Sequence, residues 1–213
     1  SRSVGLFCKA SVYLQFKEYS LAEPLLLECL NLALASQDSQ DKEMVPMCYN
    51  SLGYIYLENN LLKAEDYLNK SIEYTKKYKR DNPGSLTDPV LNLGMLHYRT
   101  GEYKTALEYF YKALTYAKED QNFQKISACL NNVGLCHMMN GDYASAISVL
   151  EQAKDLAATY SGANSVIYAM ALQNMTVYYG NLYEYDKCID ITMQVAMIFE
   201  KIYGRNSEEY GAT

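Results

Sequence analysis

The chain carries one spacing pattern five times, and this repetition limits its possible folds more than any other feature of the sequence. Small or medium-sized residues recur at intervals of 40 to 43 positions. A second set follows eleven or twelve residues after the first, and a third set follows seven residues after the second. In order, the three sets are Ala10, Gly53, Gly94, Gly134 and Thr176; Ala22, Ala64, Ala106, Ala146 and Cys188; and Cys29, Ser71, Ala113, Ala153 and Val195. A period of this length predicts an array of small supersecondary units stacked on one another.

Residues 89–114 show what one unit contains. Two apolar-striped stretches meet at a polar turn around Gly101, and a glycine there is a stop signal for the first helix. In the second stretch, Ala106, Phe110 and Ala113 are spaced to share one face of a helix. Small residues on that face allow two helix axes to approach closely. We therefore expect each unit to be a helical hairpin.

The predicted hairpins follow one another along the whole chain and form one array. We expect a single domain over residues 1–213, with repeats near 3–42, 43–86, 87–122, 123–163 and 164–204 and with 205–213 as the start of a further repeat. The polar stretch 36–42 and the loop 80–89 are expected as connections. Because terminal repeats need a polar cap and neither end shows one, we expect the chain to be a segment excised from a longer protein.

Composition excludes several classes of protein. The chain is 49% hydrophobic and has no run of about 18 apolar residues, so we expect neither a membrane span nor a membrane partner. Its formal net charge of −6 argues against a nucleic-acid partner. The six cysteines form no CxxC pair, and in a chain of this size they are expected to be reduced thiols of a cytoplasmic protein.

The repeated residues resemble a known family. The segments LNLGMLHYRTGEYKTALEYFYKAL and LNNVGLCHMMNGDYASAISVLEQA match the tetratricopeptide repeat nearly position by position. The repeat here is longer than the usual 34 or so residues, and no tryptophan is present. The longer form is similar to the repeats of kinesin light chains and of bacterial peptide-sensing and signalling proteins. This resemblance implies an all-α fold, a right-handed α-solenoid of five stacked hairpins whose first helices line a concave groove.

The two histidines, His97 and His137, occupy the same repeat position. In the family that position packs within the hairpin, and no carboxylate or cysteine is seen at metal-ligand spacing. Cys136 and His137 are adjacent on a helix and point about 100° apart, so they cannot form a thiol–imidazole pair. We expect packing roles for both histidines.

No catalytic or cofactor-binding motif is present, so we expect a non-enzymatic protein with no cofactor and no metal. The basic cluster at 76–80, Lys76-Lys77-Tyr78-Lys79-Arg80, has two interpretations. It is either a solvated helix end that complements the helix dipole, which we favour, or a docking patch for an acidic segment.

Asparagines provide the strongest functional signal. Asn92, Asn132 and Asn174 share one register, one residue before a core position, and asparagine is disfavoured inside helices. In related long-repeat proteins, asparagines at this register hold the backbone of an extended peptide, since an amide both donates and accepts hydrogen bonds. The neighbouring positions are apolar and rich in methionine, which suits apolar anchors. The residues expected to line the groove are Asn92, Asn132, Asn174, Asn50, Asn131, Tyr54, Met95, Tyr98, Arg99, Leu135 and Met138.

The sequence therefore predicts a non-catalytic interaction module that binds an extended peptide or a partner helix in its groove. The alternative is a regulatory or sensor segment of a larger signalling enzyme, protease or transcription regulator, contacting another domain of its own chain. Self-association through an uncapped terminal repeat is a further possibility.

Overall fold

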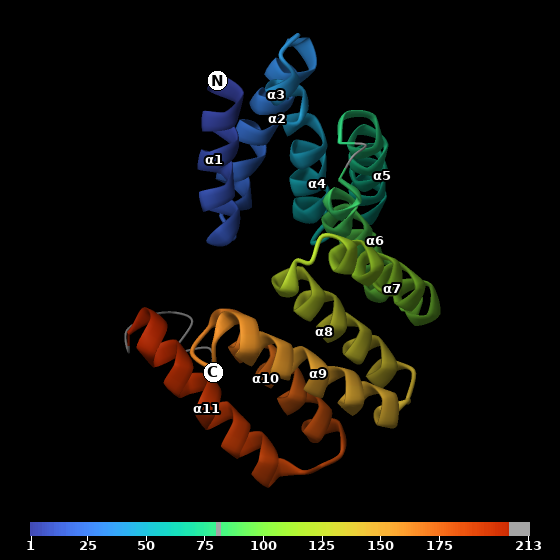
Figure 1. Cartoon of the computed structure of the whole chain (residues 1–213), viewed down its shortest axis with the longest axis vertical. Coiled ribbons are helices and arrows are strands. Elements are labelled where there is room, and N and C mark those ends of the chain that lie inside the picture. Colours follow the sequence, from blue (N-terminus) through green and yellow to red (C-terminus); the bar gives the residue numbers. More distant parts are fainter. Residues whose placement is uncertain (80–81, 205–213) are drawn as a thin grey trace. The chain divides into compact units, whose positions relative to one another are not determined.

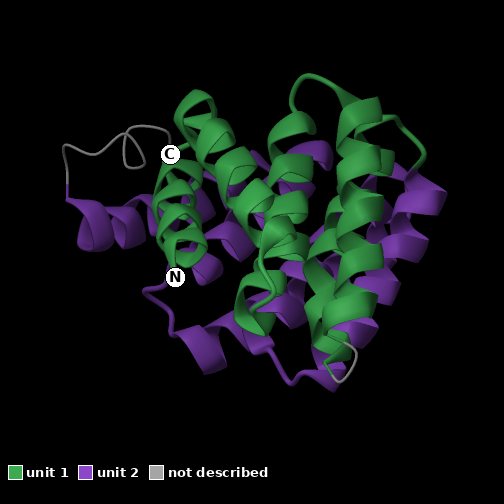
Figure 2. Cartoon of the chain, turned by 90° about the horizontal axis from the view of Figure 1, so that it is seen from above, with its two compact units in different colours: residues 1–102 green, residues 103–213 purple. Residues whose placement is uncertain are grey.

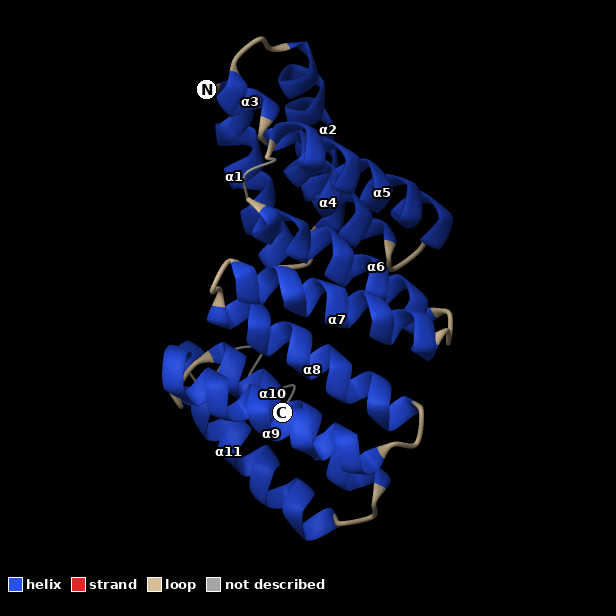
Figure 3. Ribbon diagram, turned by 45° about the vertical axis from the view of Figure 1, so that its right-hand side comes forward, coloured by secondary structure: helices blue, strands red, loops and turns tan. Residues whose placement is uncertain are grey.

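In the computed structural model, every regular element of the described residues, 1–79 and 82–204, is helical (Figures 1 and 3). The elements are α1 (Arg2–Gln15), α2 (Tyr19–Ala35), α3 (Ser39–Lys42), α4 (Met44–Tyr56), α5 (Leu61–Tyr78), the 3-10 helix η1 (Pro83–Leu86), α6 (Thr87–Arg99), α7 (Tyr103–Glu119), α8 (Phe123–Met139), α9 (Tyr143–Ser161), α10 (Val166–Asn181) and α11 (Tyr185–Tyr203). The expected all-α architecture is confirmed. None of these helices has the length and the apolar character that crossing a membrane requires.

The chain divides into two compact units, Ser1–Glu102 and Tyr103–Thr213 (Figure 2). Unit 1 contains α1 to α6, and unit 2 contains α7 to α11. The boundary falls in the turn that follows Gly101, within the third repeat. Residues 205–213, expected to begin a further repeat, lie outside the described residues, as do residues 80–81 of the expected loop.

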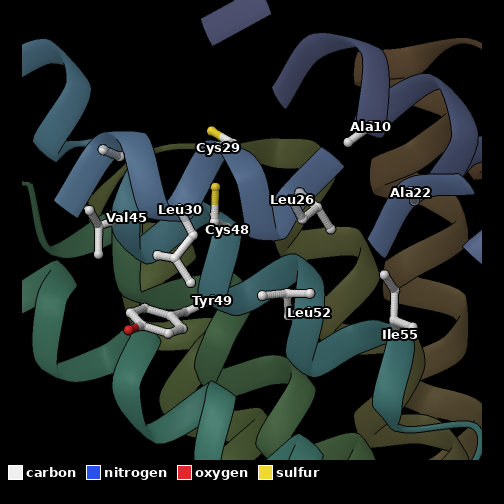
Figure 4. Packing of buried hydrophobic residues seen from close by; sticks show 11 residues of the cluster. Ala10, Ala22, Leu26, Cys29, Leu30, Val45, Cys48, Tyr49, Leu52 and Ile55 are labelled. Atoms are coloured by element: carbon white, nitrogen blue, oxygen red, sulfur yellow. The ribbon is translucent and has the colours of Figure 1, made fainter. Parts of the chain in front are cut away.

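Among the described residues, the longer helices of unit 1 form two hairpins and one further helix, α6, and the short helices α3 and η1 lie in the connections. Helix α1 packs on α2, α4 packs on α5, and α6 packs on both α4 and α5. The core between the first two hairpins consists of small and branched side chains together with Tyr49. Leu26 and Leu52 are fully buried there, and Ala10 and Ala22 lie at the crossing of α1 and α2 (Figure 4). Each hairpin alone would leave these faces in water, so stacking supplies the apolar burial that stabilises the unit.

Glycine at the repeat's first position is required by a close approach of two helices. A Cβ atom placed on Gly53 would lie 2.6 Å from Cδ2 of Leu68 on α5. Carbon atoms cannot approach that closely, so a larger residue would force the buried Leu68 side chain or helix α5 to shift. The predicted role of the small-residue positions is therefore confirmed in the α4–α5 hairpin.

A short helix occupies part of the stretch 36–42 that was expected to be a simple connection. Asp38 caps α3 by accepting a 2.7 Å hydrogen bond from the backbone amide of Gln40. Asp41 then accepts hydrogen bonds from Ser1 at 2.6 Å, from Ser36 at 2.8 Å and from Ser3. This carboxylate ties α3 to the start of α1 and the end of α2, and the local capping signal of Asp38 was overlooked.

The following connection is also more ordered than expected. Residues 83–86 form η1, and α6 begins at Thr87. Thr87 is fully buried, and its hydroxyl has no hydrogen-bond partner within the described structure. Helix α6 begins inside the stretch 80–89 that was expected to be a loop, at the expected start of the repeat 87–122.

Unit 2 repeats the same arrangement. Helix α8 packs on α9 and α10 on α11, while α10 also packs on α8 and α9. Leu150, Leu172 and Val195 lie in the core of this unit. Helix α7 packs on α8, so the unit contains two complete hairpins and one additional helix.

The turns of four of the five repeats contain a residue with positive φ at the same repeat position, whereas the shorter turn of the second repeat, 57–60, contains none. Gly101 and Gly141 have φ values of +79° and +77°, in the left-handed region. The equivalent residues in the first and fifth repeats are Lys17, with φ of +56°, and Tyr183, with φ of +60°. The turn geometry is therefore kept even where glycine is absent, at a cost in backbone strain.

Candidate functional site

A cavity of about 370 Å³ lies on the first helices of unit 1. Helices α1, α4 and α6 all contribute to it, and these are the first helices of their repeats. Its lining residues are Ser11, Leu14, Gln15, Asn50, Ser51, Tyr54, Asp88, Leu91 and Asn92. Three of the residues predicted to line a groove, Asn50, Tyr54 and Asn92, thus come together at one cavity.

Two asparagines are joined across this cavity. The Nδ2 atom of Asn92 on α6 donates a 3.0 Å hydrogen bond to Oδ1 of Asn50 on α4. Both side chains are half-buried, so each still faces solvent. This single bond leaves the amide group of Asn50 and the carbonyl oxygen of Asn92 with unused hydrogen-bonding capacity. The pair can therefore offer one donor and one acceptor to a bound peptide unit.

Tyrosines form the next part of the same face. Tyr54 is 40% exposed, and Tyr19 packs against it edge to face with ring centroids 6.3 Å apart. Burial, together with the neighbouring Tyr54, raises the pKa of Tyr19 to about 12. An exposed aromatic ring held by a second ring is a suitable contact for an apolar ligand group, because little side-chain entropy is lost when it binds.

Arg99, also predicted to line the groove, is engaged within unit 1. Its guanidinium group donates to both carboxylate oxygens of Glu58, at 2.8 and 3.3 Å, and to the backbone oxygen of Leu57 at 3.1 Å. These bonds link the end of α4 to the end of α6. Its present role in the structure is to join two neighbouring repeats.

The predicted groove residues that follow Asn92 on α6 are partly accessible to solvent. Met95 and Tyr98 are both half-buried, and Tyr98 also has an interaction partner within the chain. Met95 is one turn from Asn92 on the same helix. It is therefore the predicted apolar contact on α6 that lies nearest in sequence to the asparagine pair.

Unit 2 presents a second set of predicted residues on α8 and α10. Asn132, Leu135 and Asn174 are half-buried. The Nδ2 atom of Asn132 donates to the backbone oxygen of Ala128 at 3.1 Å, which leaves its carbonyl oxygen for another partner. The exposed apolar side chains near them are Met139, Met170 and Val177. Met170 was missed, although it lies one helical turn before Asn174.

Two predicted groove residues are buried and need correction. Met138 is 4% exposed and packs in the core of unit 2, whereas its neighbour Met139 is exposed. Asn131 is 7% exposed, and its carbonyl oxygen has no hydrogen-bond partner among the described residues. Successive residues of a helix point about 100° apart. Met138 and Asn131 therefore point to the packed face of α8, whereas their neighbours Met139 and Asn132 remain accessible.

The histidines lie half-buried at the hairpin turns, and their carboxylate partners were overlooked. Nδ1 of His97 lies 2.9 Å from Oε2 of Glu102, and Nδ1 of His137 lies 3.3 Å from Oδ2 of Asp142. The backbone oxygen of each histidine also accepts a 2.9 Å hydrogen bond from the amide of the same acidic residue. Each pair thus closes the turn of its own repeat.

Cysteine chemistry is restricted by burial. All six cysteines are free thiols, and four of them are buried. Burial raises the pKa of Cys136 to about 12, so this thiol stays protonated beside His137. Among the described residues, no group of three or more histidine, cysteine, aspartate and glutamate side chains is arranged to hold a metal ion.

Helical hairpins stacked with small residues at their crossings define the chain as a helical-repeat protein. Family models give the repeat its identity. Two tetratricopeptide-repeat models match residues 91–119 and 127–160. A third model, described as anaphase-promoting complex subunit 5, matches residues 3–55. No curated protein is similar enough to this chain to count as a relative.

Solved structures agree in fold. BtubC (BKLC) from P. vanneervenii superposes with a TM-score of 0.73 at 17% identity, covering 91% of this chain and 82% of that one. A Rap protein complexed with competence and sporulation factor gives a TM-score of 0.76 at 16% identity, with coverage of 93% and 54%. A signal-transduction ATPase with numerous domains from Pyrococcus horikoshii, which has a tetratricopeptide-repeat sensor, gives 0.73 at 22% identity, with coverage of 99% and 32%.

The chain contains tetratricopeptide repeats, and its fold is that of solved tetratricopeptide-repeat structures. The predicted fold class, an all-α solenoid of such repeats, is confirmed, and so is the likeness to kinesin light chain repeats, since a putative kinesin light chain from Podosopora anserina superposes with a TM-score of 0.66 at 16% identity over 94% of this chain and 96% of that one. The chain spans about half of the Rap protein and a third of the ATPase. This fold fits a role in protein interaction or sensing.

Proposed function

We propose that the chain is a non-catalytic interaction module that binds an extended peptide or a partner helix along the first helices of its repeats. The Asn50–Asn92 pair at the cavity on α1, α4 and α6 carries this proposal. Its two amides hold each other in place with one hydrogen bond and keep a donor and an acceptor for a ligand. In an extended peptide, the backbone supplies both complementary groups at every residue other than proline.

The apolar part of the cavity supports the same class of ligand. Leu14, Leu91 and Tyr54 lie beside the asparagines, so a bound peptide can place an apolar side chain there while its backbone reaches the amides. Removal of this apolar surface from water contributes about 25 cal/mol per Å², and the amides fix the register of the chain. In unit 2, Asn132, Asn174 and Leu135 offer the same combination on α8 and α10. In unit 1, Met95 and Tyr98 on α6 are further contacts for a ligand at the asparagine pair.

A selection of random linear peptides on the immobilised chain tests this proposal. We expect the selected peptides to lose at least tenfold in affinity when Asn50 and Asn92 are both replaced by alanine, because about 1.4 kcal/mol of hydrogen bonding corresponds to that factor. The paired substitution of Asn92 and Asn132 by alanine is expected to weaken binding as well. Melting temperatures of all variants are measured alongside.

The matched control is Asn69→Ala, which removes an exposed asparagine from α5, outside the cavity. Selected peptides should bind this variant with unchanged affinity. If the Asn50 and Asn92 variants retain full affinity while the chain remains folded, these residues do not form the binding site.

A second candidate function is that of a regulatory or sensor segment within a larger protein. The tetratricopeptide-repeat sensor of the Pyrococcus horikoshii ATPase supports it, since that chain is about three times as long as the region it shares with this one. In such a protein the occupant of the first-helix face would be another domain of the same polypeptide. Limited proteolysis of the full-length protein tests this, because release of that domain should expose Tyr54 and Met95 to chemical labelling.

Location and assembly belong to the same proposal. Free thiols at all six cysteines support a cytoplasmic location. Self-association through a terminal repeat would use α11, where Ile189, Met193 and Met197 form an exposed apolar row at four-residue spacing. Light scattering over a range of concentrations distinguishes a monomer from an assembly.

A further inference from the structure

A second cavity, of about 300 Å³, is lined by residues of α9, α10 and α11 in unit 2. Its apolar surface comes from side chains that are at least nine-tenths buried, Leu172, Met175 and Ile191. Polar groups surround this surface. The complete lining is Lys154, Tyr168, Leu172, Met175, Tyr179, Lys187, Asp190, Ile191 and Gln194. None of these residues belongs to the first-helix face proposed above.

The repeat pattern identifies the same place in unit 1. Aligning Gly53 with Thr176 and Ala64 with Cys188 pairs every lining residue of α10 and α11 with a residue of α4 or α5. Two of the polar residues are unchanged, because Lys63 corresponds to Lys187 and Asp66 to Asp190. The other pairs are Val45 with Tyr168, Tyr49 with Leu172, Leu52 with Met175, Tyr56 with Tyr179, Tyr67 with Ile191 and Lys70 with Gln194.

In unit 1 this place is filled by tyrosine rings. The ring of Tyr67 stacks on Tyr56 with centroids 5.6 Å apart and lies 6.0 Å from Tyr49, which Figure 4 shows within the core. The Nζ atom of Lys63 lies 3.8 Å from the centroid of Tyr56. A chain of aromatic rings under a lysine ammonium group therefore closes the corner between the helices.

In unit 2 the lysine and its tyrosine remain, but the filling rings are absent. Nζ of Lys187 lies 4.7 Å from the centroid of Tyr179. Ile191 and Leu172 take the places of Tyr67 and Tyr49, and each is smaller than a tyrosine. Tyr168 is larger than Val45, its equivalent, but two tyrosine rings of unit 1 are replaced by smaller side chains at this cavity.

We propose that this cavity binds an aromatic side chain, tyrosine or phenylalanine, of a partner protein, in the position that Tyr67 takes in unit 1. A dry apolar cavity of about 150 Å³ is enough to hold benzene, so the space accommodates a phenol ring. Lys154 and Lys187 line its edge, where an ammonium group complements the negative face of an aromatic ring, although Lys154 also pairs with Asp155 at 3.5 Å and Lys187 with Glu184. Asp190 and Gln194 can accept a hydrogen bond from the hydroxyl group of a tyrosine.

The test fills the cavity from within. Ile191→Tyr places a ring where the cavity lies, and we expect the melting temperature to rise by about 2–4 °C. The probes are p-cresol, which reproduces the tyrosine side chain, and a blocked Gly-Tyr-Gly peptide with Gly-Ala-Gly as its control. In NMR titrations of the whole chain, p-cresol and the tyrosine peptide should shift the methyl signals of Met175 and Ile191, and Gly-Ala-Gly should not. The Ile191→Tyr variant should lose binding of both probes.

Two further variants make the interpretation specific. Ile189→Tyr adds a ring to an exposed position of the same helix and should leave both probes bound. The pair Tyr49→Leu and Tyr67→Ile gives unit 1 the side chains of unit 2 and should create a second p-cresol site. A fall in melting temperature for Ile191→Tyr, or probe binding that this variant does not reduce, would overturn the proposal. Binding of p-cresol without the tyrosine peptide would overturn the assignment to a protein side chain.

Discussion

Leu150 on α9 lies so close to Gly134 on α8 that a Cβ atom on the glycine would be 2.6 Å from Cδ2 and 2.7 Å from Cγ of the leucine. The same distances, to the same two leucine atoms, separate a Cβ on Gly53 from Leu68 in an earlier repeat. Two hairpins thus use one contact, a leucine of the second helix seated on a glycine of the first. This contact brings the two helices of the α4–α5 hairpin and of the α8–α9 hairpin close together.

Gly134→Ala is therefore expected to destabilise the chain, against the usual trend. In a helix interior, alanine is normally better than glycine by about 0.5–1 kcal/mol. Here the new methyl group collides with Leu150, and overpacking of this kind costs about 1–3 kcal/mol. Chemical denaturation should show a net loss of stability for Gly134→Ala and a larger one for Gly134→Leu. The same expectation for Gly94→Leu stays a prediction.

The control uses a glycine without such a neighbour. Gly5 lies in α1, and a Cβ placed on it would meet no atom within 4 Å. Gly5→Ala should stabilise the chain by about 0.5–1 kcal/mol, because only the helix propensity changes. Equal effects at the two positions would show that the contact with Leu150 does not determine the choice of glycine.

Lowering the pH should reduce the stability of unit 1, because Asp41 becomes protonated. Hydrogen bonds from Ser1, Ser3 and Ser36 lower the pKa of this carboxyl group from 3.8 to about 2. A carboxyl group with a lowered pKa in the folded state stabilises it at pH values above the unfolded pKa, and this contribution is lost as the pH falls through the folded pKa. The difference in unfolding free energy between the native chain and Asp41→Asn should therefore shrink between pH 3.8 and about 2. A constant difference over that range would contradict the assignment.

Much of the fold could be predicted because it is recorded five times in the sequence. The small residues at Gly53 and Gly134 gave the period, and the period gave the hairpins. Helix α3 could not be found in this way, because it occurs in only one repeat. Its evidence was purely local, the capping residue Asp38, and a four-residue helix has no apolar period to reveal it.

The candidate site was predicted less accurately, because an error of one residue along a helix turns the predicted side chain by about 100°. Asn92 and Asn50 were placed at one site, and the structure joins them. Met138 and Asn131 were placed one position from the open face, and both are buried. The pairing of His137 with Asp142 was also missed, since the contact depends on how the turn folds back and not on spacing along one helix.

The Arg99–Glu58 contact should stabilise unit 1 modestly and mainly through the arginine. The two side chains are 36% and 47% exposed, and exposed ion pairs contribute about 0.2–1 kcal/mol. Glu58→Gln removes the charge but leaves the 3.1 Å bond from Arg99 to the oxygen of Leu57. We therefore expect Arg99→Ala to cost more than Glu58→Gln, and added salt to reduce the effect of Glu58→Gln. Chemical denaturation at two ionic strengths measures both, and equal losses for the two variants would exclude a role for the Leu57 bond.

Replacing lysine by glycine should raise stability at the hairpin turn, at Lys17, and lower it inside a helix, at Lys9. Lys17 holds a left-handed φ of +56°, a conformation that costs about 1–2 kcal/mol for a residue with a Cβ atom. Lys17→Gly should therefore stabilise the chain by about 0.5–1 kcal/mol, because relief of strain exceeds the added entropy of the unfolded chain. Gly141→Ala, at φ of +77°, should cost about 1 kcal/mol. Lys9→Gly makes the same change as Lys17→Gly inside helix α1, where glycine should destabilise by up to about 1 kcal/mol. If both lysine variants lose stability in thermal unfolding, the strain at Lys17 is smaller than the entropy that glycine adds.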